Sequence, residues 1–197
     1  MFDLDDSIPV ELAPLAFLIG TWQGTGVISY PTHEGEFEFS QQITFSHDGE
    51  SYLTYVSTAK LNDEKGTVLP SEVGYWRIAR PAEDADHGPG LLPGKGEPTY
   101  KTREDLEQLR NATGGFDIEA SIIHPSGISE HYLGQVKAGR IDIRTVEGSS
   151  RSENSKAYAG AVRIYGLVEG ALLWAWDIAA LGQDLESHAS ARLEKVS

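Results

Sequence analysis

The sequence predicts an all-β protein, a single closed or nearly closed antiparallel β-barrel of about ten strands. Most of the chain alternates apolar and polar residues or is rich in β-branched and aromatic residues, a pattern typical of half-buried strands. Short glycine-bearing links join many of these runs, which favours hairpins over parallel crossovers. The edges of so many strands must be paired or covered, and closing the sheet on itself does this most completely.

The predicted strands follow a short apolar segment, residues 9–20, which predicts a short helix that plugs one end of the barrel. The strands are expected at residues 21–30, 36–46, 51–60, 68–80, 115–124, 127–136, 140–147, 157–168, 171–180 and 185–196. A chain of 197 residues is long enough for one core and short for two. We therefore expect a single barrel domain over residues 1–197.

Residues 81–114 depart from the strand pattern and form a long insertion. The first half is rich in proline and glycine, and the stretch from Thr102 to Asp105 resembles the capping box that begins a helix. A loop of this length in a compact domain is usually functional or mobile. We expect a mobile surface segment, with a lid over the cavity as the alternative.

The composition excludes several classes of function. The chain has 30 acidic and 16 basic side chains, a formal net charge of -14, which repels nucleic acid and anionic membrane surfaces. It has no cysteine, which excludes disulfides, thiolate nucleophiles and iron–sulfur ligation. The start of the chain is acidic and its apolar stretch is short, which argues against a signal peptide or a membrane span. We expect a cytoplasmic protein.

Gly20, Trp22, Gly24 and Gly26 form a G-x-W-x-G-x-G motif at the start of the first predicted strand. Glycines let a strand bend and pack closely, and a tryptophan can fill one end of a barrel. The spacing matches neither a dinucleotide-binding fingerprint nor a Walker A loop. The motif is therefore interpreted as structural.

This motif is the first of six sequence blocks that together resemble the nitrobindin family. The others are YPT at 30–32, FSHDG at 45–49, EVGY at 72–75, HPSGISE at 124–130 and LGQDLESHASARL at 181–193. The blocks occur in the family's order and cover almost the whole chain apart from the insertion. Family members are ten-stranded barrels distantly similar to fatty-acid-binding proteins.

The resemblance implies one heme b per chain at the barrel mouth, with its iron bound by His188. It places Lys156 and Thr32 near the heme. It also implies that His188 is the catalytic ligand in the isomerisation of peroxynitrite to nitrate, alongside nitric oxide binding. The partners would be small reactive nitrogen species, with no nucleic acid and no membrane, and the sequence leaves a homodimer open.

The residue chemistry can be checked against this implication. Without cysteine or internal methionine, six histidines and eight tyrosines remain as heme ligands, and one axial histidine leaves the opposite face of the iron open. Strict strand alternation nevertheless places His188 on the same face as Ser190 and Arg192. If His188 faces a cavity, either a β-bulge lies near Ser187 or the strand borders a polar cavity mouth.

The other histidines receive ordinary structural interpretations. His47 and His124 lie beside turn residues and are interpreted as parts of hairpins. Glu130 and His131 are neighbours in the sequence, but neighbours on a strand point to opposite faces. We expect only one of the two side chains to face the barrel interior.

Two other functions are compatible with this sequence. A lipid or fatty-acid carrier of the same barrel class would hold no heme, and Arg192 would pair with the lipid carboxylate. A degenerate family member would use the insertion for protein contacts. In that case deleting residues 83–112 would abolish partner binding but leave the barrel folded.

Overall fold

The structure is a computed structural model that describes residues 7–30, 35–146 and 149–197. In chain order the elements are η1 (Val10–Leu18), β1 (Gly20–Ser29), β2 (Glu36–Ser46), β3 (Leu53–Leu61), β4 (Val68–Ile78), α1 (Arg103–Glu107), β5 (Phe116–His124), β6 (Ile128–Lys137), β7 (Arg140–Thr145), β8 (Ser150–Arg151), β9 (Tyr158–Val168), β10 (Ala171–Ala180) and β11 (Glu186–Lys195). Strands dominate, as the alternating pattern predicted.

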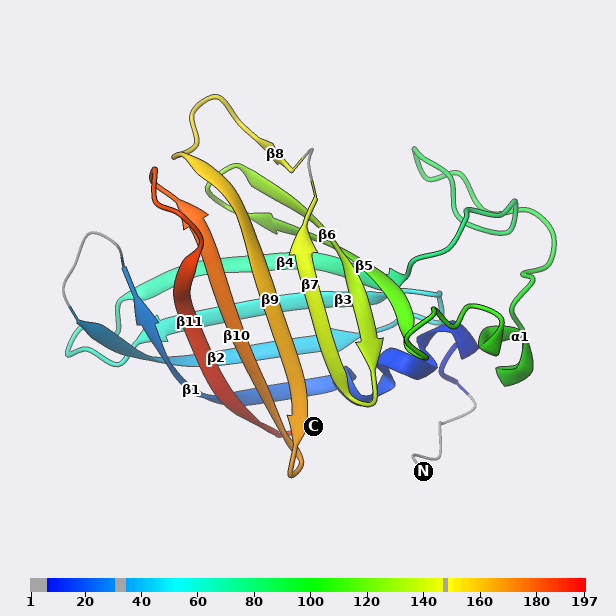
Figure 1. Ribbon diagram of the computed structural model, residues 1–197, viewed down its shortest axis with the longest axis horizontal. Coiled ribbons are helices and arrows are strands. Elements are labelled where there is room, and N and C mark those ends of the chain that lie inside the picture. The colour runs from blue at the N-terminus through cyan, green and yellow to red at the C-terminus, as the bar shows by residue number, and fades with distance from the viewer. Residues whose placement is uncertain (1–6, 31–34, 147–148) are drawn as a thin grey trace.

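Ten of the strands form a closed antiparallel barrel (Figure 1). Around the barrel the order is β5, β4, β3, β2, β1, β11, β10, β9, β7 and β6, and β6 pairs again with β5 to close it. This confirms the predicted fold class. The sequence did not predict β8, which pairs with β6, because two residues are too short to show a period.

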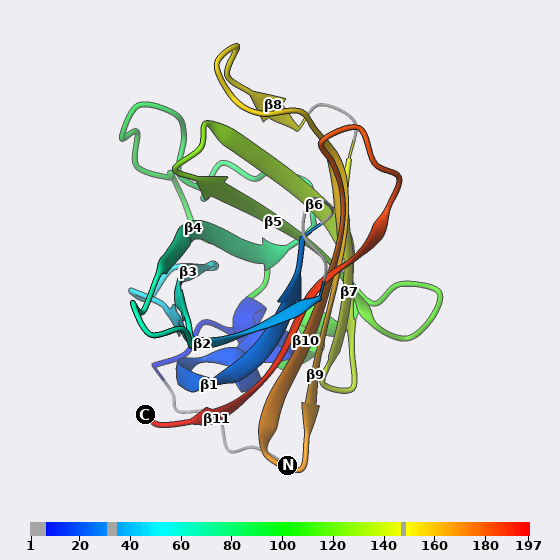
Figure 2. The same cartoon turned by 90° about the vertical axis from the view of Figure 1, so that its left-hand side faces the viewer.

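The alternation in the sequence sets which side chains enter the barrel. On β4, Trp76 and Ile78 are buried, whereas Tyr75 and Arg77 between and beside them are exposed. This period of two repeats along most strands and places apolar and aromatic side chains in a common interior. Figure 2 shows the same barrel turned by 90°, with β2, β3 and β4 on one side and β9, β10 and β11 on the other.

The short helix η1 covers one end of the barrel, as the apolar segment predicted. It is a 3-10 helix, and its Leu12, Leu15 and Leu18 are fully buried. The indole Nε1 of Trp22 donates a 2.7 Å hydrogen bond to the carbonyl oxygen of Leu18. Trp22 therefore ties the start of β1 to the helix that closes this end.

The glycine motif allows close backbone approach between β1 and β11. A Cβ on Gly24 would lie 2.1 Å from the carbonyl oxygen of Arg192. We expect Gly24→Ala to destabilise the barrel by about 1–3 kcal/mol, because backbone atoms must move apart. Urea unfolding checks this, with Gly166→Ala as the control, since a Cβ there meets nothing nearer than 4.0 Å. Equal losses from the two substitutions would contradict the close-approach explanation.

The insertion packs at the end of the barrel that η1 covers (Figure 1). Its first anchor is Arg80, whose guanidinium donates to Glu11 of η1 at 2.6 Å and to Asp86 at 2.7 Å. Its second is α1, which begins with the predicted capping box between Thr102 and Asp105. Leu106 of this helix is buried in the core.

This placement answers whether the insertion is a lid. His188 lies at the other end of the barrel, where its ring contacts the carbonyl of Ser29 at the end of β1. The strand β1, ten residues long, separates the two ends by roughly 30 Å at about 3.3 Å per residue. The lid alternative is therefore wrong.

Among the described residues, no helix has the length and apolar character needed to cross a membrane.

Candidate functional site

A β-bulge turns His188 toward the barrel interior. In the pairing of β10 with β11, Trp176 is opposite Ala189, but the next residue, Asp177, is opposite Ser187. His188 is the extra residue between these pairs, and an extra residue re-aims its side chain. Of the two alternatives that the sequence left open, the bulge near Ser187 is thus confirmed, and it explains why strict alternation pointed His188 toward water.

The contacts of His188 favour a neutral imidazole whose Nε2 makes no hydrogen bond to the described residues. Its Nδ1 lies 2.8 Å from the carbonyl oxygen of Ser29. A carbonyl only accepts, so Nδ1 carries the proton and Nε2 keeps its lone pair. Burial lowers the pKa of His188 below its usual 6.5, which favours the neutral ring that binds metals. The rings of Tyr30 and Trp176 pack nearly at right angles to it.

The lowered pKa predicts how metal binding at His188 depends on pH. A proton and an iron atom compete for Nε2, so hemin affinity should stay constant until the pH falls below 6.5 and reaches the lowered pKa. Below that point it should fall about tenfold per pH unit. The hemin-free protein should lose stability at higher pH, between 6.5 and the lowered pKa, because in that range the unfolded chain binds this proton and the folded protein does not. Hemin titrations between pH 8 and about pH 4 test this. A decline that begins above pH 6.5 would contradict it.

A cavity of about 220 Å³ opens beside His188 inside the barrel. Most of its walls are apolar or aromatic, and its lining includes Tyr30, Phe39, Trp174, Trp176, His124 and His188. Such walls suit a flat aromatic macrocycle, and a neutral histidine with a free Nε2 suits its iron. Burial raises the pKa of Tyr30, so its phenol stays protonated and is a poorer ligand. The residues present therefore fit a heme.

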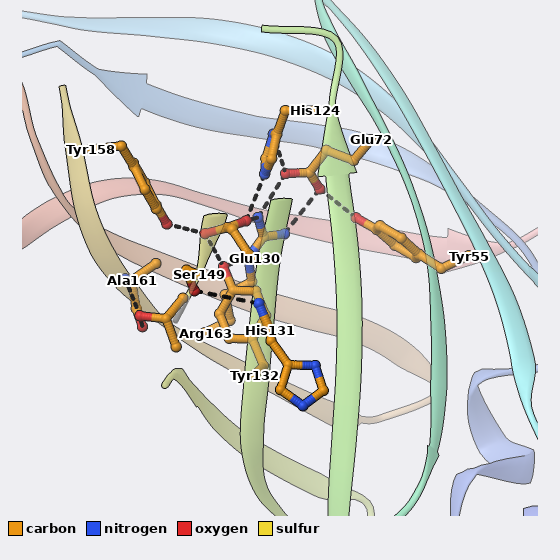
Figure 3. Close-up of polar contacts among 11 residues, drawn as sticks. Tyr55, Glu72, His124, Glu130, His131, Tyr132, Ser149, Tyr158, Ala161 and Arg163 are labelled. Atoms are coloured by element: carbon orange, nitrogen blue, oxygen red, sulfur yellow. Dashed lines mark hydrogen bonds and ion pairs between the residues drawn. The ribbon is translucent and has the colours of Figure 1, made fainter. Parts of the chain in front are cut away.

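Four charged or titratable side chains lie next to this cavity, and we call them the ion-pair network: Glu72, His124, Glu130 and Arg163. Three of them are buried and His124 is partly buried. Arg163 donates to Glu72 at 2.6 Å and to Glu130 at 3.3 Å. His124 Nε2 lies 2.5 Å from Glu130 and its Nδ1 lies 3.6 Å from Glu72. Figure 3 shows these side chains pointing toward one another from β4, β5, β6 and β9.

Three tyrosines complete the network. Tyr55 donates to Glu72 at 2.7 Å, Tyr132 donates to Glu130 at 2.6 Å, and Tyr158 also donates to Glu130. Burial alone would raise the pKa of Glu72, but Arg163 outweighs it and lowers that pKa to about 2. The Glu72 carboxylate is therefore charged, and both carboxylates accept hydrogen bonds from buried donors.

The network also has the spacing of a metal site. Glu72, His124 and Glu130 offer ligand atoms within 4.8 Å of one another. A metal ion would have to displace Arg163 and the phenol donors from both carboxylates, leaving a guanidinium buried without a counter-charge. We interpret the arrangement as an ion-pair network and not as a metal site.

The other residues singled out in the sequence fall in different places. Lys156 is exposed, and the adjoining Ala157 accepts a hydrogen bond from Leu181 in the β10–β11 connection, so Lys156 lies at the same barrel end as His188. Thr32 lies outside the described residues. The motif residues Gly20, Trp22, Gly24 and Gly26 lie on β1.

Two expectations need correction. Arg192 lies on the outer face of β11, half exposed, and pairs with Glu194, because Ala191 and Leu193 take the inward positions. It cannot hold a lipid carboxylate inside the barrel. His124 is more than a hairpin residue, since its ring lines the cavity and belongs to the ion-pair network.

Glu130 and His131 point to opposite faces, as alternation predicted (Figure 3). Sequence reasoning nevertheless missed the network that Glu130 belongs to. A signal was present, because Arg163 lies between Ala161 and Tyr165 at inward positions of one strand. A charged residue at an inward position requires a partner of opposite charge at an inward position of another strand.

Comparisons with known proteins agree with this geometry. A sequence profile of the THAP4-like, heme-binding β-barrel domain matches residues 11–195. The chain is 52% identical over 197 residues to a peroxynitrite isomerase of Leifsonia xyli subsp. xyli, covering 99% of both chains. It is 50% identical to a peroxynitrite isomerase of Clavibacter michiganensis subsp. michiganensis, with full coverage of both. It also superposes on the crystal structure of Rv2717c from M. tuberculosis with a TM-score of 0.70 and 25% identity, covering 99% of this chain and 100% of that one.

Proposed function

We propose a function from one premise: this chain belongs to the family of THAP4-like, heme-binding β-barrel domains. The resemblance noted in the sequence is thereby confirmed, and a heme is the cofactor that the family binds. The relatives named above act on peroxynitrite according to their names. The function that follows for this chain is the heme-dependent isomerisation of peroxynitrite to nitrate.

The observation that carries the proposal is the state of His188. Its Nδ1 is held by a backbone carbonyl, its pKa is lowered by burial, and its side chain lines the cavity. This is how proteins orient a histidine as a metal ligand. His188 would therefore be the axial ligand of a heme b, one per chain.

A ferric heme, when bound, supplies a Lewis-acidic centre on which peroxynitrite rearranges to nitrate. The chain contributes the rest. His188 orients the group, and the aromatic walls keep bulk water from its edge. His124, which also lines the cavity, contacts Glu130 through Nε2 and Glu72 through Nδ1, so among the described residues His188 is the cavity imidazole available to a metal. Lys156 and Thr32 as residues near the heme, and nitric oxide as a further ligand, belong to the same proposal.

The lipid-carrier alternative receives no support from the described interior. Its carboxylate would need an unengaged cation, but Arg192 is outside the barrel and Arg163 is saturated by two glutamates. A cytoplasmic location, a homodimer and partner binding by the insertion stay predictions.

The experiment is the decay of peroxynitrite with hemin-saturated protein, followed by the yield of nitrate. We expect faster decay and a higher nitrate yield than with the same concentration of free hemin, since the barrel isolates the reacting fragments. The hemin-free protein is the control and should not accelerate decay. Equal rates with protein-bound and free hemin would overturn the proposed activity.

A further inference from the structure

Trp176 lies between the ion-pair network and His188. The centroids of the Trp176 and His188 rings are 5.2 Å apart, with the planes nearly perpendicular at 83°. On the network side, the guanidinium carbon of Arg163 lies 4.0 Å from the centre of the Trp176 ring. The ring of His124 stacks nearly parallel to it at 6.1 Å. One indole thus contacts two members of the network and the candidate iron ligand.

The backbone fixes this position as firmly as the side chains do. Trp176 is the direct cross-strand partner of Arg163 on β9 and of Ala189 on β11. The bulge that turns His188 inward begins immediately after it, between Trp176 and Asp177. Cross-strand partners share a face of the sheet, so Trp176, Arg163 and the bulged His188 meet inside the barrel.

His188 needs such support. Its hydrogen bond to Ser29 fixes one point of the ring, but an imidazole held at one point can still pivot about that bond. Metal-binding histidines depend on surrounding groups that fix the ring plane as well as the tautomer. Trp176 supplies a flat wall nearly perpendicular to the ring, and this wall is itself held by a cation–π contact in a water-poor interior.

We propose that Trp176 is a positioning residue that fixes the plane of the His188 imidazole before heme binds, and that the ion-pair network holds Trp176 in place. The proposal rests on the proposed role of His188 as iron ligand. It assigns the network a purpose beyond barrel stability, because the network sets the shape of the surface against which the ligand packs.

The test compares Trp176→Leu, Trp176→Phe and Trp76→Phe. Trp76 is a matched control, since it is a buried interior tryptophan whose Nε1, like that of Trp176, has no hydrogen-bond partner among the described residues. It contacts Tyr165 and Tyr55 instead of His188. The first readout uses the hemin-free protein: nuclear magnetic resonance of the His188 imidazole, assigned with His188→Ala. We expect faster solvent exchange of its Nδ1 proton in Trp176→Leu only.

The second readout is hemin dissociation, followed by transfer to excess apomyoglobin. We expect dissociation to be about 10- to 100-fold faster in Trp176→Leu, the usual range for losing a group that supports a metal ligand. Trp176→Phe should release hemin more slowly than Trp176→Leu because it keeps an aromatic wall. If the leucine variant does not fold, the phenylalanine variant is compared with the wild type instead. The Trp76→Phe variant should release hemin at the wild-type rate.

The outcomes separate the two proposals. If Trp176→Leu and Trp176→Phe keep the wild-type imidazole exchange and hemin release, the positioning role is overturned while heme ligation by His188 stands. If Trp76→Phe releases hemin as fast as Trp176→Leu, general loosening of the interior explains the effect and the positioning role is again overturned. If wild-type protein binds hemin independently of His188, the proposed function fails, and the exchange of the Nδ1 proton still reports on Trp176.

Discussion

Replacing His188 with alanine is expected to abolish the Soret band that one equivalent of hemin produces with the wild-type protein. His188 is the cavity histidine with a free ring nitrogen among the described residues, because His124 contacts Glu130 through Nε2 and Glu72 through Nδ1. Loss of a group that merely supports a ligand costs about 10- to 100-fold in metal affinity. Loss of the ligand should cost more than about 100-fold, measured by hemin titration of both proteins.

The matched control for this prediction is His131→Ala. His131 is a half-exposed histidine on the outer face of β6, so the same substitution there should leave the titration unchanged. If His188→Ala binds hemin as tightly as His131→Ala, the axial ligand is another residue. Circular dichroism of both variants would confirm that the barrel is intact, since the bulge removes His188 from the regular pairing of β10 with β11.

Arg163→Met is expected to produce the largest loss of stability. The guanidinium is the cation that faces both Glu72 and Glu130, and all three side chains are buried. Its removal leaves two carboxylates in a water-poor interior with only hydrogen-bond donors and His124 around them. Breaking a buried ion pair in this way costs about 3–5 kcal/mol, which urea unfolding can measure.

Arg192→Met is the control for this effect. Arg192 also pairs with a glutamate, Glu194, but both side chains are at least half exposed, so its loss should cost less than about 1 kcal/mol. Adding Glu72→Gln and Glu130→Gln to Arg163→Met should recover part of the lost stability, because the unpaired buried charges are then gone. If Arg163→Met lowers the free energy of unfolding no more than Arg192→Met does, the ion-pair network does not stabilise the barrel interior.

The sequence predicted the barrel well because period-two alternation is a local property that each strand displays by itself. It also pointed to the short helix over residues 9–20 and to the capping box at Thr102. The direction of His188 could not be read from alternation, because a bulge depends on how two strands pair. The segment from Leu185 to Ala189 contains no residue that marks a bulge, so only the resemblance to known heme proteins drew attention to His188.

The ion-pair network shows a second limit of reading the sequence. Glu72, His124, Glu130 and Arg163 lie on four strands, separated by up to 91 residues. Glu72 and Glu130 look like ordinary polar residues in their own segments, and His124 before Pro125 looks like turn chemistry. Only Arg163, at an inward position of its strand, signals that a partner is needed. These side chains come together because the barrel closes, so that β4 and β9 face the same interior.

The insertion, anchored beside η1 and far from His188, gives the protein two ends with separate uses. Residues around Gly90 and the fully exposed Leu91 extend into solvent about a barrel length away from the cavity. A fluorophore, an affinity tag or a surface tether attached there would leave the opposite opening unobstructed. The fold could therefore be immobilised on an electrode or a sensor chip with its reactive end facing the sample.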